Sequence, residues 1–163
     1  MDHDMHNGGS TNELTFERLG ELGLDIRGLS AVPYGPEHED LIQEWWGHRH
    51  RGGFPLALLP PLGVVVLDEG HPSGMIFCYE CYGVGVGFLE FAVTRPGMGL
   101  RKAGAVLGFA VASCMQLAGK CVEPVANVPY FRVSTSAASA RFLLRLGFSF
   151  TGKIERGMIY NNT

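Results

Sequence analysis

One carboxylic acid stands inside an otherwise apolar segment of this 163-residue chain. Glu90 is the only acid in the run Phe88–Val93, and such a run is typical of a buried strand. Burial disfavours the charged form of a carboxylic acid, so it would raise the pKa of this side chain toward neutrality. A carboxylate with such a pKa is suited to accept a proton. A solvent-facing position, or a pairing with an arginine, accounts for the same residue equally well.

The cysteines lie within apolar segments. Cys78 and Cys81 have the spacing of half a zinc site or of a redox pair. In a strand, however, residues three positions apart face opposite sides and cannot easily share one metal ion. No second pair follows at a zinc-ribbon spacing. We therefore expect reduced thiols in the core, Cys114 and Cys121 included, and no metal site.

The most basic local stretch is His48–Arg51, which follows Trp45 and Trp46. Cations beside aromatic rings could bind an anionic substrate or the phosphates of a nucleic acid. We favour a solvated helix end with its tryptophans in the core, because the whole chain carries a net charge of −3. Nucleic acid therefore stays an open but not a favoured partner. Zinc binding by His48 and His50 is less favoured still, because residues two apart on a helix diverge.

The elements that must position these residues are loosely patterned in the first half of the chain. We expect helices over Glu13–Leu24 and Glu37–His50, with a strand over Asp25–Val32 between them. An apolar loop, Phe54–Pro61, follows, since its prolines exclude a regular central strand. Residues 1–12 are polar and predict a flexible N-terminal extension.

The second half predicts a sheet with helices. Strands are expected over Gly63–Asp68 and Met75–Tyr82 as a hairpin, and over Phe88–Thr94. The elements expected after them are a helix over Leu100–Leu117 capped by Gly119, a strand over Cys121–Val128, a helix over Ser136–Leu146 closed by Gly147, and a terminal strand pair over Phe148–Gly152 and Ile154–Tyr160. Residues 13–163 therefore predict a single domain of α/β (α+β) class with a mixed sheet flanked by helices.

Two motifs lie in this second half. The first runs from Val93 to Gly104 and places glycines and cations at a predicted helix start, where free N–H groups and the helix dipole can bind phosphate. An ordinary strand-to-helix turn explains it equally well. The second opens with Ser136 and ends in Leu-Gly-Phe at Phe148. Together, from about Gly87 onward, they resemble the acyl-CoA-binding half of the GCN5-related N-acetyltransferase (GNAT) superfamily. The helix with Trp45 and Trp46 and the entry strand over Leu59–Val66 resemble, more faintly, short phage-encoded members.

This resemblance implies an acetyl-CoA-dependent N-acetyltransferase with a small-molecule or macromolecular amine as acceptor. Acetyl-CoA would lie in an opening between the strands over Phe88–Thr94 and Cys121–Val128. Glu90 would be the general base that removes a proton from the ammonium, and Tyr130 is a candidate second catalytic residue. The implied cofactor-binding residues are Ala92, Val93, Met98, Gly99, Arg101, Lys102, Ala103, Gly104 and Ser136.

The chain also departs from the family's pattern. Val106 stands where a small residue is usual, Ser136 replaces an Asn, and Leu143 replaces the Tyr that protonates the leaving thiolate. Water could supply that proton, or one of several hydroxyl groups: Tyr130, Ser134, Thr135 or Tyr160. A GNAT-fold protein that binds CoA or a partner without turnover therefore stays open. So does a GNAT-like enzyme that modifies a nucleobase or nucleic acid.

Composition limits the remaining possibilities. The chain is 46% hydrophobic, which is ample for one buried core, yet no run approaches the ~20 apolar residues of a membrane-spanning helix. The first ten residues contain acids and no apolar stretch, unlike a signal peptide. We therefore expect a cytoplasmic protein without a membrane partner. A homodimer stays open.

Overall fold

The computed structural model describes residues 14–81, 86–121, 130–133 and 137–149 of the chain. In this part a single mixed sheet has the strand order β1-β2-β3-β4-β5. The strands are β1 (Leu29–Pro33), β2 (Leu62–Asp68), β3 (His71–Cys81), β4 (Val86–Thr94) and β5 (Tyr130–Val133). Neighbours from β1 to β4 pair antiparallel, whereas β5 runs parallel to β4. The predicted mixed sheet is thus confirmed.

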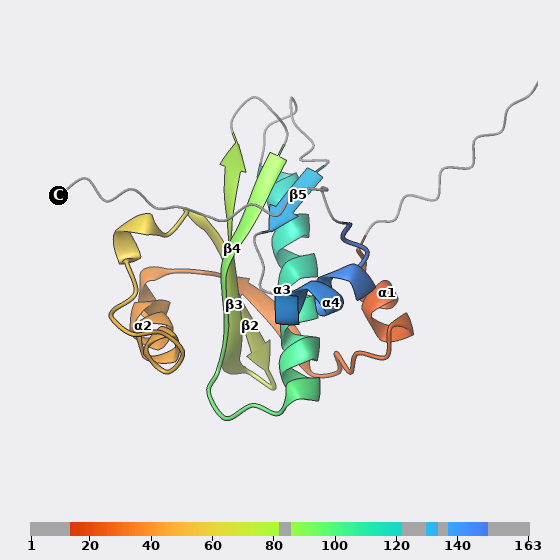
Figure 1. Ribbon diagram of the computed structural model, residues 1–163, viewed down its shortest axis with the longest axis horizontal. Coiled ribbons are helices and arrows are strands. Elements are labelled where there is room, and N and C mark those ends of the chain that lie inside the picture. The colour runs from red at the N-terminus through yellow and green to blue at the C-terminus, as the bar shows by residue number, and fades with distance from the viewer. Residues whose placement is uncertain (1–13, 82–85, 122–129, 134–136, 150–163) are drawn as a thin grey trace, which may run out of the picture.

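Helices cover both faces of this sheet. They are α1 (Phe16–Glu21), α2 (Glu39–Gly47), α3 (Leu100–Cys121) and α4 (Ala137–Arg145), with the short 3₁₀ turns η1 (Pro36–His38) and η2 (Leu56–Leu58). Figure 1 shows the sheet nearly edge-on, with α2 on one side and α3, α1 and α4 on the other. None of the helices in the described part of the chain is long and apolar enough to cross a membrane.

The larger core lies between the sheet and α3, and we call it the α3-face core. Its fully or nearly fully buried members include Leu19, Val64, Val66, Ile76, Leu89 and Val106. Strand residues alternate between the two faces, so every second residue of β2 and β3 points toward α3. At Gly74 a Cβ atom would lie 2.4 Å from Cγ1 of Val106, so glycine lets α3 approach the sheet closely at this point.

The smaller core lies beneath α2, and we call it the α2-face core. It consists of Ile42, Trp45, Phe54, Val65, Met75, Phe77 and Val93. The Gln43 side chain holds the proline-rich loop against α2. Its Oε1 accepts from the Phe54 N–H at 2.9 Å, and its Nε2 donates to the Phe54 carbonyl at 3.0 Å. The loop is thereby fixed over the same face as α2.

An irregularity interrupts β4 in its second half. Glu90 pairs with Phe77 of β3 and Val93 pairs with Met75, so two residues of β4 oppose the single residue Ile76. This arrangement is a β-bulge. Phe91, within it, has a φ of 54°, which is a rare backbone conformation for a bulky side chain. Such strained positions concentrate at functional sites.

Several predicted boundaries in the first half were wrong. The first helix is confined to Phe16–Glu21, because Gly23, with a φ of 76°, turns the chain just beyond it. The first strand begins at Leu29 instead of Asp25, since a turn through Gly28, with a φ of 73°, precedes it. The second helix starts as the 3₁₀ turn η1 and ends at Gly47, before the basic run.

The prediction for the end of the long helix was also wrong. Gly119 does not cap α3, which continues to Cys121, because a helix interior tolerates one glycine at a cost of only about 1 kcal/mol. Cys121 is therefore helical, and the rest of the predicted strand Cys121–Val128 lies outside the described residues. The strand that pairs with β4 is Tyr130–Val133.

The helix cap predicted at the Leu-Gly-Phe ending is confirmed, but the strand predicted to start at Phe148 does not begin there. Gly147 has a φ of 97°, and the Phe148 N–H donates to the Leu143 carbonyl at 3.1 Å. The Gly147 N–H donates to the Leu144 carbonyl, also at 3.1 Å, which completes a left-handed helix cap. Phe148 itself is not in a strand. The remainder of the predicted terminal strand pair lies outside the described residues.

Candidate active site

Glu90 lies on the face of the sheet that α2 covers. Its neighbour Leu89 belongs to the α3-face core, and its cross-strand partner Phe77 belongs to the α2-face core. The side chain is half-buried, and this burial raises the pKa of the Glu90 carboxyl above its usual value. Glu90 forms no ion pair with any residue that the structure describes. The carboxylate is therefore placed as a proton acceptor would be.

Aromatic rings surround Phe91, the residue next to Glu90. The Phe91 ring lies 5.1 Å from Phe54 and 6.0 Å from Trp46, both in edge-on contacts. On its other side Tyr79 of β3 lies 6.3 Å away. Distances between ring centroids of this size are those of favourable aromatic pairs. The β4 bulge thus inserts one ring into an aromatic cluster that joins α2, its following loop and β3.

Tyr79 ties β3 to the proline-rich loop. Its hydroxyl donates a hydrogen bond to the carbonyl of Leu58 in η2. Burial, and then the charge of Glu90, raises the pKa of the Tyr79 phenol, so the phenol stays protonated at neutral pH. The register, with Phe77 opposite Glu90 and Tyr79 opposite Phe88, puts Tyr79 and Glu90 on the same face of the sheet. Sequence reasoning missed Tyr79, because nothing in its local pattern distinguishes it from other strand aromatics.

The described pairing of β5 with β4 reaches Leu89, the residue before Glu90. The parallel ladder runs from Val86, opposite Tyr130, to Leu89, opposite Val133. Beyond Leu89, the described part of the chain provides β4 with a strand partner only on its β3 side. Leu89, Glu90 and the bulge at Phe91 are thus consecutive along β4.

Tyr130 lies at the opposite end of the same ladder. It pairs with Val86, four positions before Glu90. Because a strand rises about 3.3 Å per residue, this pairing separates the Tyr130 backbone from Glu90 by about 13 Å along the strand. Leu143, at the family's tyrosine position, is buried in the α3-face core. Leu143 has no phenol to donate, and the Tyr130 backbone lies at the far end of the ladder from Glu90.

The glycine-containing turn between β4 and α3 is held at its start. The Arg95 N–H donates to the Ser73 carbonyl at 3.0 Å, and Gly97 has a φ of 78°. Gly99 precedes the helix, and a Cβ atom there would meet no atom within 4 Å. The first helical bond runs from the Ala103 N–H to the Gly99 carbonyl at 2.9 Å. The amides of the first helical turn precede this bond, as in sites that bind phosphate.

The predicted cofactor-binding residues are brought to this end of the sheet but differ in surroundings. Arg101 and Gly99 are exposed, whereas Lys102 donates to Asp68 Oδ1 at 2.6 Å in an ion pair. Val93 is buried in the α2-face core, and Met98 packs against the α3-face core. Ala103 and Gly104 are half-buried. Ala92 is exposed, and Ser136 lies outside the described residues.

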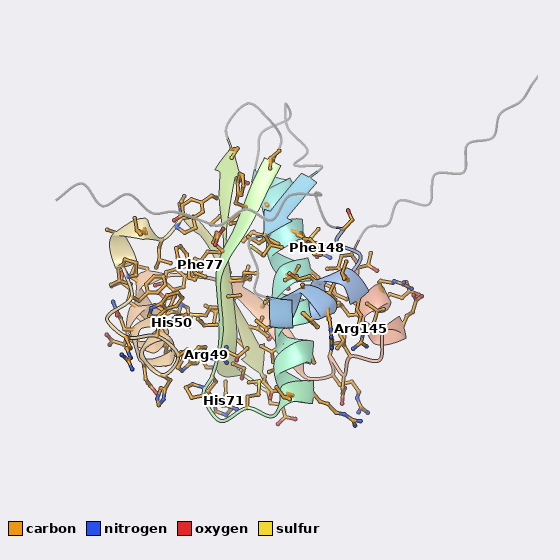
Figure 2. The ribbon with its side chains drawn as sticks, viewed as in Figure 1. Arg49, His50, His71, Phe77, Arg145 and Phe148 are labelled. Carbon is orange, nitrogen blue, oxygen red and sulfur yellow. The ribbon has the colours of Figure 1, made fainter. Side chains whose placement is uncertain are left out.

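Arg49, which follows α2, contacts the end of β4 from the α2 side of the sheet. Its guanidinium donates to Oγ1 of Thr94, the last residue of β4. Figure 2 shows Arg49 and His71 near the end of the sheet from which β4 leads to α3. The next residue, His50, stacks on Trp46 with 3.7 Å between ring centroids. The basic run was visible in the sequence, but its contact with a residue 45 positions away was not.

A hollow of about 290 Å³ lies on the other face of the sheet, between α1, α3 and β1. Its walls are mainly apolar, with the Ser113 hydroxyl and Gln116 among the residues that line it. None of its lining residues carries an acid, a base or a nucleophilic thiol. We therefore place the candidate active site at Glu90 and not at this hollow.

Comparisons with known proteins support the fold. No protein-family model matches the sequence, and no curated protein matches it. Among solved structures, glucosamine-6-phosphate N-acetyltransferase from Arabidopsis thaliana superposes with a TM-score of 0.54 at 12% identity, over 82% of this chain and 99% of that one. The aminoglycoside N-acetyltransferase AAC(6')-Iy, in complex with a CoA bisubstrate analogue, superposes with 0.58 at 17% identity, over 83% and 98%.

A third structure is a probable acetyltransferase from meticillin-resistant Staphylococcus aureus, with a TM-score of 0.55 at 15% identity, over 82% of this chain and 98% of that chain. At such identities the likeness shows the fold alone. The chain has the mixed α/β fold of these acetyltransferases, which is the GNAT-like fold predicted from the sequence.

Proposed function

We propose that this protein is an N-acetyltransferase that transfers the acetyl group of acetyl-CoA to an amine. The observation that carries this proposal is the half-buried Glu90, whose carboxyl has a raised pKa, next to the bulge at Phe91 on the α2 face of the sheet. Solved structures with the same fold include acetyltransferases, one of them bound to a CoA analogue.

Two groups of residues would hold acetyl-CoA. Backbone groups of Ala92 and Val93, which follow the bulged Phe91 in β4, would pair with the pantetheine arm. The free amides of the α3 N-terminus would bind the pyrophosphate, with Arg101 supplying positive charge. Near this turn we assign supporting roles to Met98, Gly99, Lys102, Ala103 and Gly104, and we keep the cofactor-binding role predicted for Ser136.

Glu90 would act as the general base. The acceptor arrives as an ammonium, and Glu90 removes one proton, so that the nitrogen lone pair can attack the thioester carbonyl carbon. A carbon–nitrogen bond forms, and the carbon–sulfur bond breaks as the sulfur leaves as a thiolate. The attacking nitrogen, which still carries one proton too many, gives it up to water to become the neutral amide. Water is the proton donor to the thiolate that we favour over Tyr130, because the Tyr130 backbone lies at the far end of the β4–β5 ladder. Transfer would yield an amide and free CoA.

Binding of acetyl-CoA is the first test. A ligand at 100 times its Kd stabilises a folded protein by about 2.7 kcal/mol, so we expect a rise of several degrees in Tm. Adenosine monophosphate at the same concentration serves as the control and should give a much smaller rise. Equal shifts for both, or no shift with acetyl-CoA, would contradict the proposed function.

A second candidate function has one observation in its favour. The contact of Arg49 with Thr94 places the basic run His48–Arg51 beside the proposed cofactor turn, as an enzyme that modifies a nucleobase or nucleic acid would require. In that case single-stranded oligonucleotides should be acetylated, with a steep loss of rate at higher salt. The same guanidinium can instead face the phosphates of CoA, and this is the assignment we prefer.

A further inference from the structure

We infer that the acceptor is an arylalkylamine, a primary amine that carries an aromatic ring on a short chain. It would bind with its ammonium at Glu90 and its ring against an apolar surface made by Tyr79, Leu58 and Phe91, which we call the Tyr79 surface. This inference rests on the proposed N-acetyltransferase function and deepens it.

The first argument is the exposure of apolar side chains. In the described part of the chain, large hydrophobic residues are markedly exposed at only four positions: Leu58, Tyr79, Leu100 and Leu144. Leu58 and Tyr79 are adjacent, because the Tyr79 hydroxyl bonds to the Leu58 carbonyl. Exposed apolar residues that gather beside a functional group mark a binding surface more often than scattered ones do. The Tyr79 surface adjoins Glu90.

The second argument is the rigidity of this surface. Phe91 is enclosed by Phe54 and Trp46 at 5.1 and 6.0 Å, and it faces Tyr79 at 6.3 Å. Tyr79 is in turn anchored to the loop through Leu58. Rings held by packing and hydrogen bonds lose little conformational entropy when a ligand binds. An acceptor ring can therefore gain contact with them at low cost.

The third argument is the apolar neighbour of Glu90 on β3. Its cross-strand partner Phe77 is fully buried and leans toward β2, where a Cβ atom at Gly63 would lie only 2.5 Å from the Phe77 ring. The Phe77 ring also meets Tyr34 edge-on at 4.8 Å. Gly63 thus accommodates a ring that would otherwise be displaced along the sheet. Glu90 therefore has a buried apolar ring as its neighbour. Apolar surroundings suit the hydrocarbon part of an amine and strengthen the attraction between the Glu90 carboxylate and an ammonium.

The fourth argument is the distribution of charge along β4. The cations Arg49 and Lys102 lie toward the Thr94 end, each bonded to a partner, and Thr94 is four positions from Glu90. A sugar phosphate would find no basic residue in β4 itself, since Glu90 is its only ionisable residue. A polycationic aminoglycoside would need several carboxylates, and β4 provides one. A single ammonium with an apolar body matches this distribution, and the adjacent rings favour a cation.

The test compares three acceptors in the presence of acetyl-CoA, with release of the CoA thiol as the readout. They are 2-phenylethylamine, kanamycin and glucosamine 6-phosphate. Because burying a ring-sized apolar group is worth about 1.5–3 kcal/mol, we expect kcat/KM for 2-phenylethylamine to exceed that of the other two by at least about tenfold. A faster reaction with kanamycin or glucosamine 6-phosphate would overturn the inference.

The same experiment separates this inference from the proposed function. If acetyl-CoA raises the Tm but 2-phenylethylamine is not acetylated, the arylalkylamine inference fails while the cofactor site stands. If acetyl-CoA does not bind, the proposed function fails, and the inference fails with it.

A pair of leucine variants tests the Tyr79 surface directly. Leu58→Ala should raise KM for 2-phenylethylamine about fivefold with little change in kcat, since it removes contact made equally in the ground and transition states. Leu144→Ala, an exposed leucine on α4, is the matched control and should leave KM unchanged. Methylamine lacks a ring, so its KM should not respond to Leu58→Ala. Equal effects of Leu58→Ala on both amines would show that Leu58 acts on the fold and not on the acceptor.

Discussion

The two faces of the sheet use similar apolar residues but arrange their polar groups differently. On the α3 face, strands and helices interlock through Leu19, Val66 and Val106, and all three are fully buried. On the α2 face, apolar packing stops at a half-buried acid, Glu90, and at a bulged residue with a φ of 54°, Phe91. The comparison separates a face packed almost entirely from apolar side chains from one that carries a half-buried acid beside backbone strain, as the proposed chemistry requires.

The thiols on the α3 face illustrate the contrast. Cys78 and Cys114 belong to the same core, and the Cys78 thiol donates to the Tyr79 carbonyl at 3.7 Å. The neighbouring Cys78 thiol, and then burial, raise the pKa of the Cys114 thiol. A buried thiol with a raised pKa is unreactive as a nucleophile. Glu90 also has a raised pKa, but its side chain is only half-buried. A raised pKa serves catalysis only where a substrate can reach the group.

The largest effect should come from shortening a buried side chain of the α3-face core. Leu19→Ala removes a fully buried side chain that packs near Gly108 of α3, and we expect the free energy of unfolding to fall by about 3 kcal/mol. Urea denaturation measures this change. The kcat of the folded variant should match that of wild type. A marked loss of kcat in the folded variant would contradict the distinction between the two faces.

On the α2 face, Glu90→Gln should lower kcat and leave the free energy of unfolding nearly unchanged. Removing a general base costs about 100-fold or more in kcat, while acetyl-CoA binding, measured by calorimetry, should be nearly unchanged. Glu80→Gln, at an exposed acid of β3, is the matched control. Turnover that survives the Glu90 substitution would exclude this residue as the base.

The pH dependence of wild type sharpens that prediction. Because burial raises the pKa of Glu90, the ionised base accumulates only at a pH above the usual titration range of a glutamate. We expect kcat/KM to rise with pH through this raised pKa. The rise should disappear from the residual activity of Glu90→Gln, and a rise that persisted would have to be assigned to another group.

A smaller effect should reveal the strain at the bulge. A left-handed conformation costs a residue with a Cβ atom about 1–2 kcal/mol, whereas glycine adopts it freely. Phe91→Gly should therefore be more stable than Phe91→Ala by about 1 kcal/mol in urea denaturation, the reverse of the usual order in strands. If alanine were the more stable, the left-handed geometry of residue 91 would be wrong.

The smallest effect concerns the ion pair at the end of the sheet. Asp68 holds Lys102 at 2.6 Å, and both side chains are partly exposed, so the pair contributes at most about 1 kcal/mol to stability. Asp68→Asn frees the ammonium for the phosphates of CoA, and we expect the Kd of CoA to fall a few-fold. Asp25→Asn, which breaks the exposed pair with Arg27, controls for charge alone. Equal changes in both variants would remove Lys102 from the proposed cofactor site.

Local patterns in the sequence were sufficient for much of this protein. The β-branched run of β2, the apolar strand around Glu90 and the helical spacing of α3 each depend on a few neighbouring residues. The cap at Gly147 does too, because only the local chain must turn there. These signals predicted the mixed sheet, its covered faces and the position of the one acid in β4.

Tertiary structure decided the contacts between residues far apart in the chain. No local pattern could show that Arg49 meets Thr94, that Tyr79 is anchored at Leu58, or that Asp68 engages Lys102. The bulge at Phe91 follows from the register between β3 and β4, which depends on packing against two cores at once. The sequence by itself determined which residue could accept a proton, whereas only the folded chain decided which surface stands beside it, because that surface is assembled from three separate segments.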